Sequence, residues 1–227
     1  MPNPDYVRGG SLFAAGLLAD ALVPILQREV KGRLLDAGCG DVPYYGVYRT
    51  LANEVTCIDW EASSHGARHV DQPVDLNAHL PFGDAVFDTV LLADVLEHVA
   101  TPQTLVAELA RVLAPGGALI VSVPFLYWVH EAPHDYFRYT EYGLRHLCAR
   151  AGLTVEECEP YGGHPDVILD LTAKVLARSQ RAGSIHARAG RALLRLPPAA
   201  RLRERTRRSF PLGYVLVARA QHAAREL

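Results

Sequence analysis

The sequence predicts an α/β fold, a three-layer sandwich in which helices cover both faces of a mostly parallel sheet. Apolar runs of strand length alternate with segments of helical periodicity from about residue 11 to residue 160, and such alternation is typical of a parallel sheet. The run at 87–92 (FDTVLL) is almost continuously apolar, as expected for a strand that helices cover on both faces. Both observations indicate one doubly covered sheet.

The strands and helices follow from composition and periodicity. Seven segments have the length and composition of strands: 33–36, 54–59, 68–71, 87–92, 118–123, 154–159 and 213–220. Helical periodicity predicts helices at 11–30, 43–51, 102–113 and 140–151. Pro24 predicts a kink in the first helix or a break into two. Thr101 and Thr140 occupy N-cap positions of the last two helices, and Gly152 is expected to end the last one.

The one compositional shift is a basic segment near the end of the chain. Residues 177–208 contain ten arginines and one acid, Glu204. We expect this segment to be helical, broken at Pro197-Pro198, and inserted between the last two strands. It predicts a lid that faces an anionic or lipid-linked substrate, or a peripheral membrane contact, with a solvated helix as the alternative.

Length and composition fit a single domain, 1–227. The chain is 49% hydrophobic and 21% charged with a formal net charge of −2, so no nucleic-acid partner is expected. The four cysteines lack CxxC spacing, no apolar run reaches the ~18 residues of a spanning helix, and residues 1–10 lack a signal-peptide pattern. We expect a cytoplasmic protein with four parts: an N-terminal helical segment (1–32), a cofactor-binding core (33–160), an Arg-rich insertion or lid (161–210), and a final strand and tail (211–227).

The first candidate site is the turn after the first strand, Asp36-Ala37-Gly38-Cys39-Gly40. The backbone of such a turn can approach a ligand closely, because a Cβ at Gly38 or Gly40 would collide with it. Asp59 ends the second strand, where a carboxylate can accept two ribose hydroxyls. No third glycine and no Walker lysine follow, so the turn predicts a nucleoside without phosphates rather than a dinucleotide.

This turn is the first of five motifs in a fixed order. They are LLDAGCG (34–40), CIDW (57–60), VDLN with FDTV (74–77, 87–90), DVLEHV (94–99) and LAPGG (113–117). In this order they resemble the motifs of the class I, Rossmann-like methyltransferases that use S-adenosylmethionine. The resemblance covers roughly residues 33–160 and departs from the family at Asp94, where glutamate is frequent.

The resemblance implies a seven-stranded sheet whose last strand is antiparallel, and a cofactor, S-adenosyl-L-methionine, that becomes S-adenosyl-L-homocysteine. It assigns nine residues to that cofactor: Asp36, Gly38, Cys39, Gly40, Asp59, Trp60, Asp75, Leu76 and Asp94. Asp59 would hold the ribose, Trp60 would lie against the adenine ring, and Asp75 would accept from its amino group. The alternatives are a packing role for Trp60 and a turn-forming role for Asp75.

The second candidate site is the loop 125–140, after the fifth strand, where open α/β folds bind ligands. Its H-D-Y-F-R-Y-T stretch resembles a small, type 11-like branch of methyltransferases. Histidine titrates near neutral pH, so His134, His130 and His98 of the DVLEHV motif are the candidate catalytic residues. The aromatic residues of the loop could instead anchor it on the core, with Arg138 paired to an acid.

Alternatives remain for the metal and for the reaction. Asp94, Glu97 and His98 are spaced as one face of a helical turn, so a divalent metal is an alternative that we do not favour, and we assign no metal ligand. The favoured reaction is methyl transfer to O, N or C of a small molecule. A methyltransferase-like protein that binds cofactor without transfer is the alternative, and an NAD-dependent oxidoreductase is less favoured because the third glycine is missing.

Overall fold

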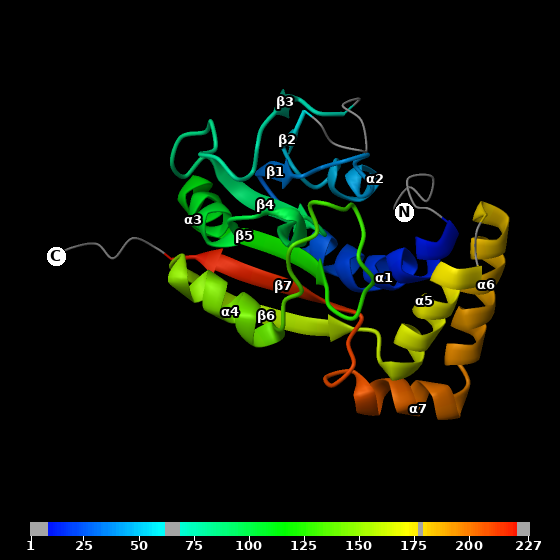
Figure 1. Cartoon of the computed structure of the whole chain (residues 1–227). Helices are drawn as coiled ribbons and strands as arrows, with labels where there is room; N and C mark the ends of the chain where they lie inside the picture. Colours follow the sequence, from blue (N-terminus) through cyan, green and yellow to red (C-terminus); the bar gives the residue numbers. More distant parts are fainter. Residues whose placement is uncertain (1–8, 62–68, 177–178, 222–227) are drawn as a thin grey trace.

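The sheet at the centre of the computed structural model has seven strands (Figure 1). They are β1 Arg33–Ala37, β2 Glu54–Asp59, β3 Gln72–Pro73, β4 Phe87–Ala93, β5 Leu113–Pro124, β6 Leu153–Tyr161 and β7 Gly213–Ala220, in the order β3-β2-β1-β4-β5-β7-β6. Strand β7 is antiparallel to β5 and β6, and the other neighbours are parallel. The structure describes residues 9–61, 69–176 and 179–221. The predicted fold class is confirmed.

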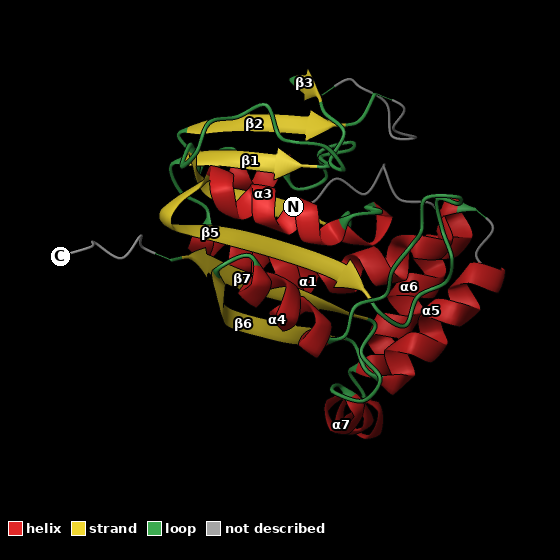
Figure 2. Ribbon diagram, turned by 60° about the vertical axis from the view of Figure 1, so that its left-hand side comes forward, coloured by secondary structure: helices red, strands yellow, loops and turns green. Residues whose placement is uncertain are grey.

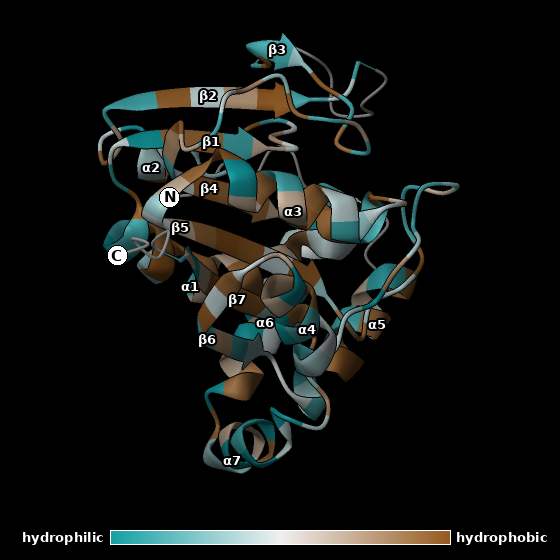
Figure 3. Cartoon of the chain, turned by 90° about the vertical axis from the view of Figure 1, so that its left-hand side faces the viewer, coloured by the Kyte–Doolittle hydropathy of each residue, from teal (hydrophilic) through white to brown (hydrophobic). Residues whose placement is uncertain are grey.

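Helices cover both faces of this sheet (Figure 2). The α-helices of the described residues are α1 Leu12–Glu29, α2 Tyr45–Tyr48, α3 Pro102–Val112, α4 Glu141–Arg150, α5 His164–Leu176, α6 Gln180–Leu194 and α7 Pro197–Thr206, with 3-10 helices η2 Gly9–Ser11 and η3 Leu96–His98. Helices α3 and α4 bury their apolar side chains against one face, and α1 and α2 against the other. Figure 3 shows the apolar residues concentrated on the central strands β4, β5 and β7.

Helix α1 is one continuous helix, so of the two alternatives at Pro24 the break into two helices is wrong. Pro24 lies on the exposed side of the helix. A proline removes the hydrogen bond to the carbonyl four residues earlier, here that of Asp20. On the exposed side water can satisfy that carbonyl, while Leu22 and Ile25 remain in the core.

Two short elements differ from their predicted bounds. The helix expected at 43–51 contracts to α2, with turn-type bonds such as Leu51 N to Tyr48 O (2.9 Å) after it. The strand expected at 68–71 is displaced to β3, and residue 68 lies outside the described residues. Asp71 contacts β2 with both its backbone and its side chain, because its N donates to Cys57 O at 2.8 Å and its Oδ2 accepts from Cys57 N at 2.8 Å.

Of the two predicted N-caps, the structure confirms one and not the other. Thr140 caps α4, since its Oγ1 accepts from Gly143 N at 3.2 Å. Thr101 occupies the N-cap position of α3 but makes no capping hydrogen bond with its side chain. Its hydroxyl lies 3.4 Å from Asn77 Oδ1 instead. The hydroxyl that would cap the helix therefore contacts the loop that contains Asn77.

The predicted helical insertion lies between β6 and β7 and consists of α5, α6 and α7 (Figure 1). Helix α6 packs on α1 and α5, and α7 packs on α5 and α6. The break at Pro197 is the start of α7. None of the helices in the described parts of the chain combines the length and the apolar composition that crossing a membrane would need.

Candidate active site

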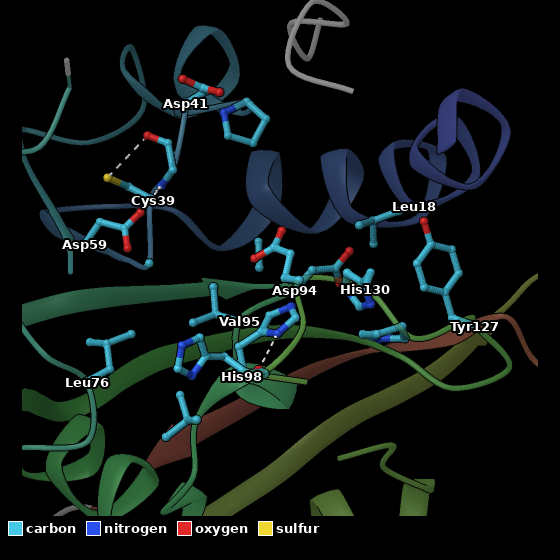
Figure 4. A pocket seen from close by; sticks show the side chains of 18 of the residues that line it. Leu18, Cys39, Asp41, Asp59, Leu76, Asp94, Val95, His98, Tyr127 and His130 are labelled. Atoms are coloured by element: carbon cyan, nitrogen blue, oxygen red, sulfur yellow. Dashed lines mark hydrogen bonds between the residues drawn. The ribbon is translucent and has the colours of Figure 1, made fainter. Parts of the chain in front are cut away.

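A cavity of about 1120 Å³ opens where the parallel strands end, between α1, the β1, β2 and β4 ends and the loop 125–140. All twelve residues that the sequence singles out line it: Asp36, Gly38, Cys39, Gly40, Asp59, Trp60, Asp75, Leu76, Asp94, His98, His130 and His134. Figure 4 shows Cys39, Asp59 and Leu76 toward one end, and Leu18 and Tyr127 toward the other. Residues expected to bind a nucleoside therefore lie at one end of the cavity, and an apolar and an aromatic residue lie at the other.

The glycine turn after β1 has a backbone that requires glycine. Gly38 has φ +72° and Gly40 has φ +51°, in the left-handed region that other residues rarely adopt. A Cβ at Gly38 would also lie 2.5 Å from Cγ2 of Val95. The sequence suggested that a side chain here would collide with a bound ligand. The structure shows that a side chain at Gly38 would also collide with Val95. Glycine at position 38 therefore lets the turn pack directly against Val95, just after β4.

Asp59 is oriented by two backbone groups of the turn region. Its Oδ2 accepts from Gly40 N at 2.9 Å, and its Oδ1 accepts from Trp60 N at 2.8 Å. A carboxylate has about four acceptor sites, so both oxygens can still accept from a ligand. These bonds hold the carboxylate at the cavity wall before any ligand binds.

Asp36 is buried beneath the same turn. Tyr48 donates a hydrogen bond of 2.5 Å from its hydroxyl to Oδ2 of Asp36. Burial raises the pKa of Asp36 to about 7, an effect that the Tyr48 hydrogen bond opposes and the charge of Asp59 reinforces. A cationic group of a ligand would favour the ionised form of this carboxyl, which suits Asp36 to an ammonium.

The expected adenine end has one contact that was not predicted. The Trp60 ring, 39% exposed, meets the His134 ring edge-on at 5.1 Å. Asp75 accepts from both the backbone N and Nδ2 of Asn77, at 2.9 and 3.0 Å. Asp75 is thus a turn former that also faces the cavity, so the two interpretations of this residue are compatible. Asn77 lines the cavity too and was not singled out.

Asp94 follows β4 with φ +52°. Its Oδ1 accepts from the Ser122 hydroxyl at 2.8 Å, and its backbone N donates to Ser122 O at 3.0 Å. Burial raises the pKa of Asp94 to about 6, while the Ser122 hydrogen bond and His98 lower it. These bonds join the β4 and β5 ends at the middle of the cavity.

The expected face of Asp94, Glu97 and His98 does not form. The chain at Leu96–His98 is a 3-10 helix, which lacks the i, i+3, i+4 geometry of an α-helix. Glu97 and His98 instead lie close to His130, which belongs to the loop 125–140. One carboxylate oxygen and one nitrogen from each imidazole, atoms that could bind a metal, lie within 4.8 Å of one another. The His98 and His130 rings meet at 4.7 Å between centroids and 76° between planes.

The H-D-Y-F-R-Y-T stretch attaches the loop to the turn after β4. Backbone N–H groups of Tyr136 and Phe137 donate to Glu97 O at 2.9 and 3.3 Å, and the Tyr139 hydroxyl donates to Leu96 O at 3.1 Å. Arg138 forms two bonds with Asp135, Nη1 to Oδ1 at 2.5 Å and Nη2 to Oδ2 at 2.7 Å. Anchoring aromatics and an acid partner for Arg138 are therefore both present in the loop.

The Arg-rich segment does not lie where a lid over the site was expected. None of its arginines within the described residues lines the cavity. Several are paired elsewhere: Arg191 with Asp20 at 3.0 Å, Arg203 with buried Asp166 at 2.5 Å and Arg207 with Glu159 at 3.4 Å. Packing of α6 and α7 on α5 holds the segment beside α1 rather than over the opening.

Helix α1 contributes a wall that sequence reasoning missed. Ala14, Ala15 and Leu18 of α1 line the cavity, as do Ser11 at its N-cap and Tyr161 of β6. Small residues at helical spacing were the available signal, but periodicity alone assigns them to the core. Leu18 lies at the same end as Tyr127 (Figure 4).

Comparisons with known proteins agree with this geometry. Residues 35–121 match the family model described as a methyltransferase domain. A malonyl-[acyl-carrier protein] O-methyltransferase of Erwinia billingiae is 27% identical over 91% of this chain and 88% of its own. A ubiquinone biosynthesis O-methyltransferase of Caulobacter sp. is 34% identical over 40% of each chain, so this match spans less than half of that relative.

Solved structures with the same fold include proteins of different activities. The crystal structure of the [4+2]-cyclase SpnF matches with a TM-score of 0.58 and 24% identity over 90% of this chain and 82% of that one. This likeness concerns the fold alone, since one fold can host several chemistries. Residues 35–121 are therefore a methyltransferase domain, and the five ordered motifs in and beside it are similar to those of the class I, Rossmann-like methyltransferases that use S-adenosylmethionine, in their type 11 branch.

Proposed function

We propose that the chain binds S-adenosylmethionine at the glycine-turn end of the cavity and transfers its methyl group to a small molecule at the other end. The observation that supports this best is that Asp36, Asp59 and the three histidines line one continuous cavity of about 1120 Å³. Single-ligand pockets commonly measure roughly 300–1,000 Å³. The space is therefore large enough for a nucleoside and an acceptor together.

Each cofactor residue would have a distinct role. Asp59 would accept the ribose hydroxyls with the lone pairs that Gly40 and Trp60 leave free. Asp36 would hold the ammonium of the methionine part, close to the backbone of Gly38. The remaining assigned residues would line the cofactor: Cys39, Gly40, Trp60, Asp75, Leu76 and Asp94.

The protein's part in the reaction is alignment and proton removal. S-adenosylmethionine, when bound, supplies a methyl group that its sulfonium already activates. Holding an acceptor in line can contribute ~7–11 kcal/mol of the barrier reduction in favourable cases. A protonated acceptor also needs a base. His134 is the first candidate, since its ring lines the cavity and contacts Trp60, and His98 and His130 are the others.

The acceptor is proposed to be a small molecule with an apolar or aromatic part. Leu18 and Tyr127 lie at that end (Figure 4), Trp128 and Tyr161 also line the cavity, and the arginines give no support for an anion there. Two relatives described as O-methyltransferases favour an oxygen acceptor. The exposed arginines Arg181, Arg188 and Arg195 leave contact with an anionic membrane as a separate hypothesis, to be tested by sedimentation with anionic vesicles.

Calorimetry with S-adenosylhomocysteine and NAD tests the cofactor assignment. We expect S-adenosylhomocysteine to bind and NAD not to bind. Asp59→Ala should weaken binding by about 10- to 100-fold through loss of charged hydrogen bonds of ~1.5–3 kcal/mol. Asp71→Ala is the matched control, because Asp71 also contacts β2 but does not line the cavity. Equal affinity in the wild type and Asp59→Ala would refute the assignment.

A turnover assay separates methyl transfer from cofactor binding alone. Release of S-adenosylhomocysteine is measured with a panel of phenols, carboxylic acids and amines. Turnover with any acceptor supports transfer. Tight cofactor binding with no release across the panel and no labelled product in cell extract would favour the non-methylating alternative.

A further inference from the structure

Glu97 lacks the partners that a buried carboxylate requires. Its side chain is 0% exposed, and neither carboxylate oxygen has a hydrogen-bond partner among the described residues. A buried polar group left without a partner costs ~1–3 kcal/mol, and more when it is charged. The methyl transfer proposed above gives Glu97 no role. Its burial therefore needs another explanation.

Two imidazole nitrogens lie near the Glu97 carboxylate. Nε2 of His98 lies 3.7 Å from Oε1 of Glu97, and Nε2 of His130 lies 3.9 Å from the same oxygen. Both distances exceed a hydrogen bond. They approach the roughly 3.4 Å between two ligands of a tetrahedral ion with bonds of 2.0–2.2 Å. One ligand atom of each residue lies within 4.8 Å of the other two, so side-chain adjustments of about an ångström would bring all three onto one cation.

The other ring nitrogens of both histidines face acceptors. Nδ1 of His98 lies 2.8 Å from His134 O. Nδ1 of His130 lies 3.3 Å from Trp128 O and 3.3 Å from Oδ2 of Asp135, closer than the 3.5 Å to the guanidinium Nη2 of Arg138. An imidazole that donates from Nδ1 has its lone pair on Nε2. Acceptors of this kind behind the distal nitrogen are typical of metal-ligating histidines.

We propose that Glu97, His98 and His130 bind a divalent first-row transition cation, of the Zn²⁺, Mn²⁺ or Fe²⁺ class. Two imidazole nitrogens and one carboxylate favour such ions over Mg²⁺ and Ca²⁺, which prefer oxygen ligands. His98 and His130 both line the cavity, so the remaining coordination positions of the cation face it. The three protein ligands thus occupy only part of the coordination shell of the cation.

In the proposed methyl transfer, on which this step rests, the cation would select an oxygen of the acceptor as the atom that is methylated. With the cation bound, an open position would be left for a hydroxyl oxygen of the acceptor, and the cation would lower the pKa of that hydroxyl. The proton passes to His134, the new C–O bond forms as the C–S bond breaks, and the sulfur retains the electron pair. The substrate class is therefore a hydroxylated small molecule rather than an amine.

Metal binding is measured directly, without cofactor or acceptor. Protein freed of metal with EDTA and dialysed is titrated with Zn²⁺ and Mn²⁺ in a calorimeter, and Co²⁺ binding is followed by its visible absorption. We expect one cation per chain. Glu97→Gln and His130→Gln should each weaken binding more than 100-fold, and Asp135→Asn, which leaves all three ligands, by about 10- to 100-fold.

His134→Ala is the matched control, because it removes a cavity histidine but keeps the backbone carbonyl that faces His98. It should bind the cation as the wild type does. Unfolding without metal shows whether Glu97→Gln folds, and loss of the buried charge should leave its melting temperature equal or higher. Absence of binding to all three cations, or unchanged binding by Glu97→Gln, would overturn the proposal. S-adenosylhomocysteine affinity of the metal-free protein tests the proposed function separately.

Discussion

His98 and His134 face each other across two motifs that lie 36 residues apart, with Nδ1 of His98 2.8 Å from the carbonyl oxygen of His134. The side chain of one histidine is thereby oriented by the backbone of the other. The His134 side chain lies against Trp60 and next to Tyr136, whose hydroxyl is 3.1 Å from its Nδ1. The two rings therefore have different partners. The His98 ring is held by a backbone carbonyl of the loop, whereas the His134 ring contacts two aromatic side chains, and both residues line the cavity.

Gly38→Ala should reduce cofactor affinity and stability together. Its φ of +72° and the 2.5 Å approach of a Cβ to Val95 both oppose the substitution. A strained backbone of this kind costs ~1–3 kcal/mol. We expect S-adenosylhomocysteine affinity to fall more than tenfold by calorimetry. Adding Val95→Ala should recover part of the stability, measured by urea unfolding, since it removes the steric part alone; no recovery would mean that backbone strain dominates.

Asp36 should make stability fall as the pH rises. Burial raises its pKa from 3.8 to about 7, so between these values the folded protein binds more protons than the unfolded chain, and the free energy of unfolding decreases with pH. Asp36→Asn should remove this component. Urea unfolding of both proteins from about pH 4 to pH 8 measures the difference; parallel curves across this window would contradict the assignment.

The same residue should couple cofactor binding to protons. An ammonium beside Asp36 favours its ionised form, so S-adenosylhomocysteine affinity should decrease as the pH falls below about 7, by up to tenfold per unit. Calorimetry in two buffers of different ionisation enthalpy would show proton release on binding. Asp36→Asn should show neither the pH dependence nor the release.

The fold was predictable because its signals are local. Alternating apolar runs set strands such as β2 and β7, whose observed bounds equal the predicted ones. The ends of elements were less predictable, since Asp71 bonds to Cys57 with its side chain as well as its backbone and the Thr101 hydroxyl faces Asn77 rather than its own helix. Such choices depend on residues far away in sequence.

The site was predictable in membership but not in grouping. The order of the motifs collected ten of the twelve predicted site residues, and the position of the loop after β5 added His130 and His134. The spacing of Asp94, Glu97 and His98 suggested one helical face, yet a 3-10 helix and the positive φ of Asp94 set Glu97 and His98 toward His130. No spacing rule connects residues 98 and 130, because helix α3, strand β5 and part of the loop lie between them.

His134→Ala should lower turnover with little effect on cofactor binding. General-base catalysis contributes about 10²- to 10⁴-fold, so kcat should fall within that range while S-adenosylhomocysteine affinity stays within about threefold. The control is His79→Ala, a histidine that pairs with Glu108 and does not line the cavity. If His134→Ala keeps full kcat and the same pH profile, another group removes the proton.

Lys174 should position the acceptor end of the cavity. Its ammonium donates to the Tyr127 hydroxyl at 2.8 Å and to Ser11 Oγ and Gly10 O at 3.0 Å, and it lies 3.1 Å from Oδ1 of buried Asp170. One buried cation thus joins α5 of the insertion, η2 and the site loop. Lys174→Met should cost about 3–5 kcal/mol of unfolding free energy, because Asp170 is left as an unpaired buried charge.

A second variant separates this stability effect from positioning. Combining Lys174→Met with Asp170→Asn removes the unpaired charge, so most of the unfolding free energy should return. Tyr127 would still lack its ammonium partner, and it lies at the acceptor end, toward the far side of the cavity from Asp59 (Figure 4). We therefore expect the double variant to raise KM for the acceptor severalfold while S-adenosylhomocysteine affinity is unchanged. If the acceptor KM recovers together with stability, Lys174 is a structural residue only.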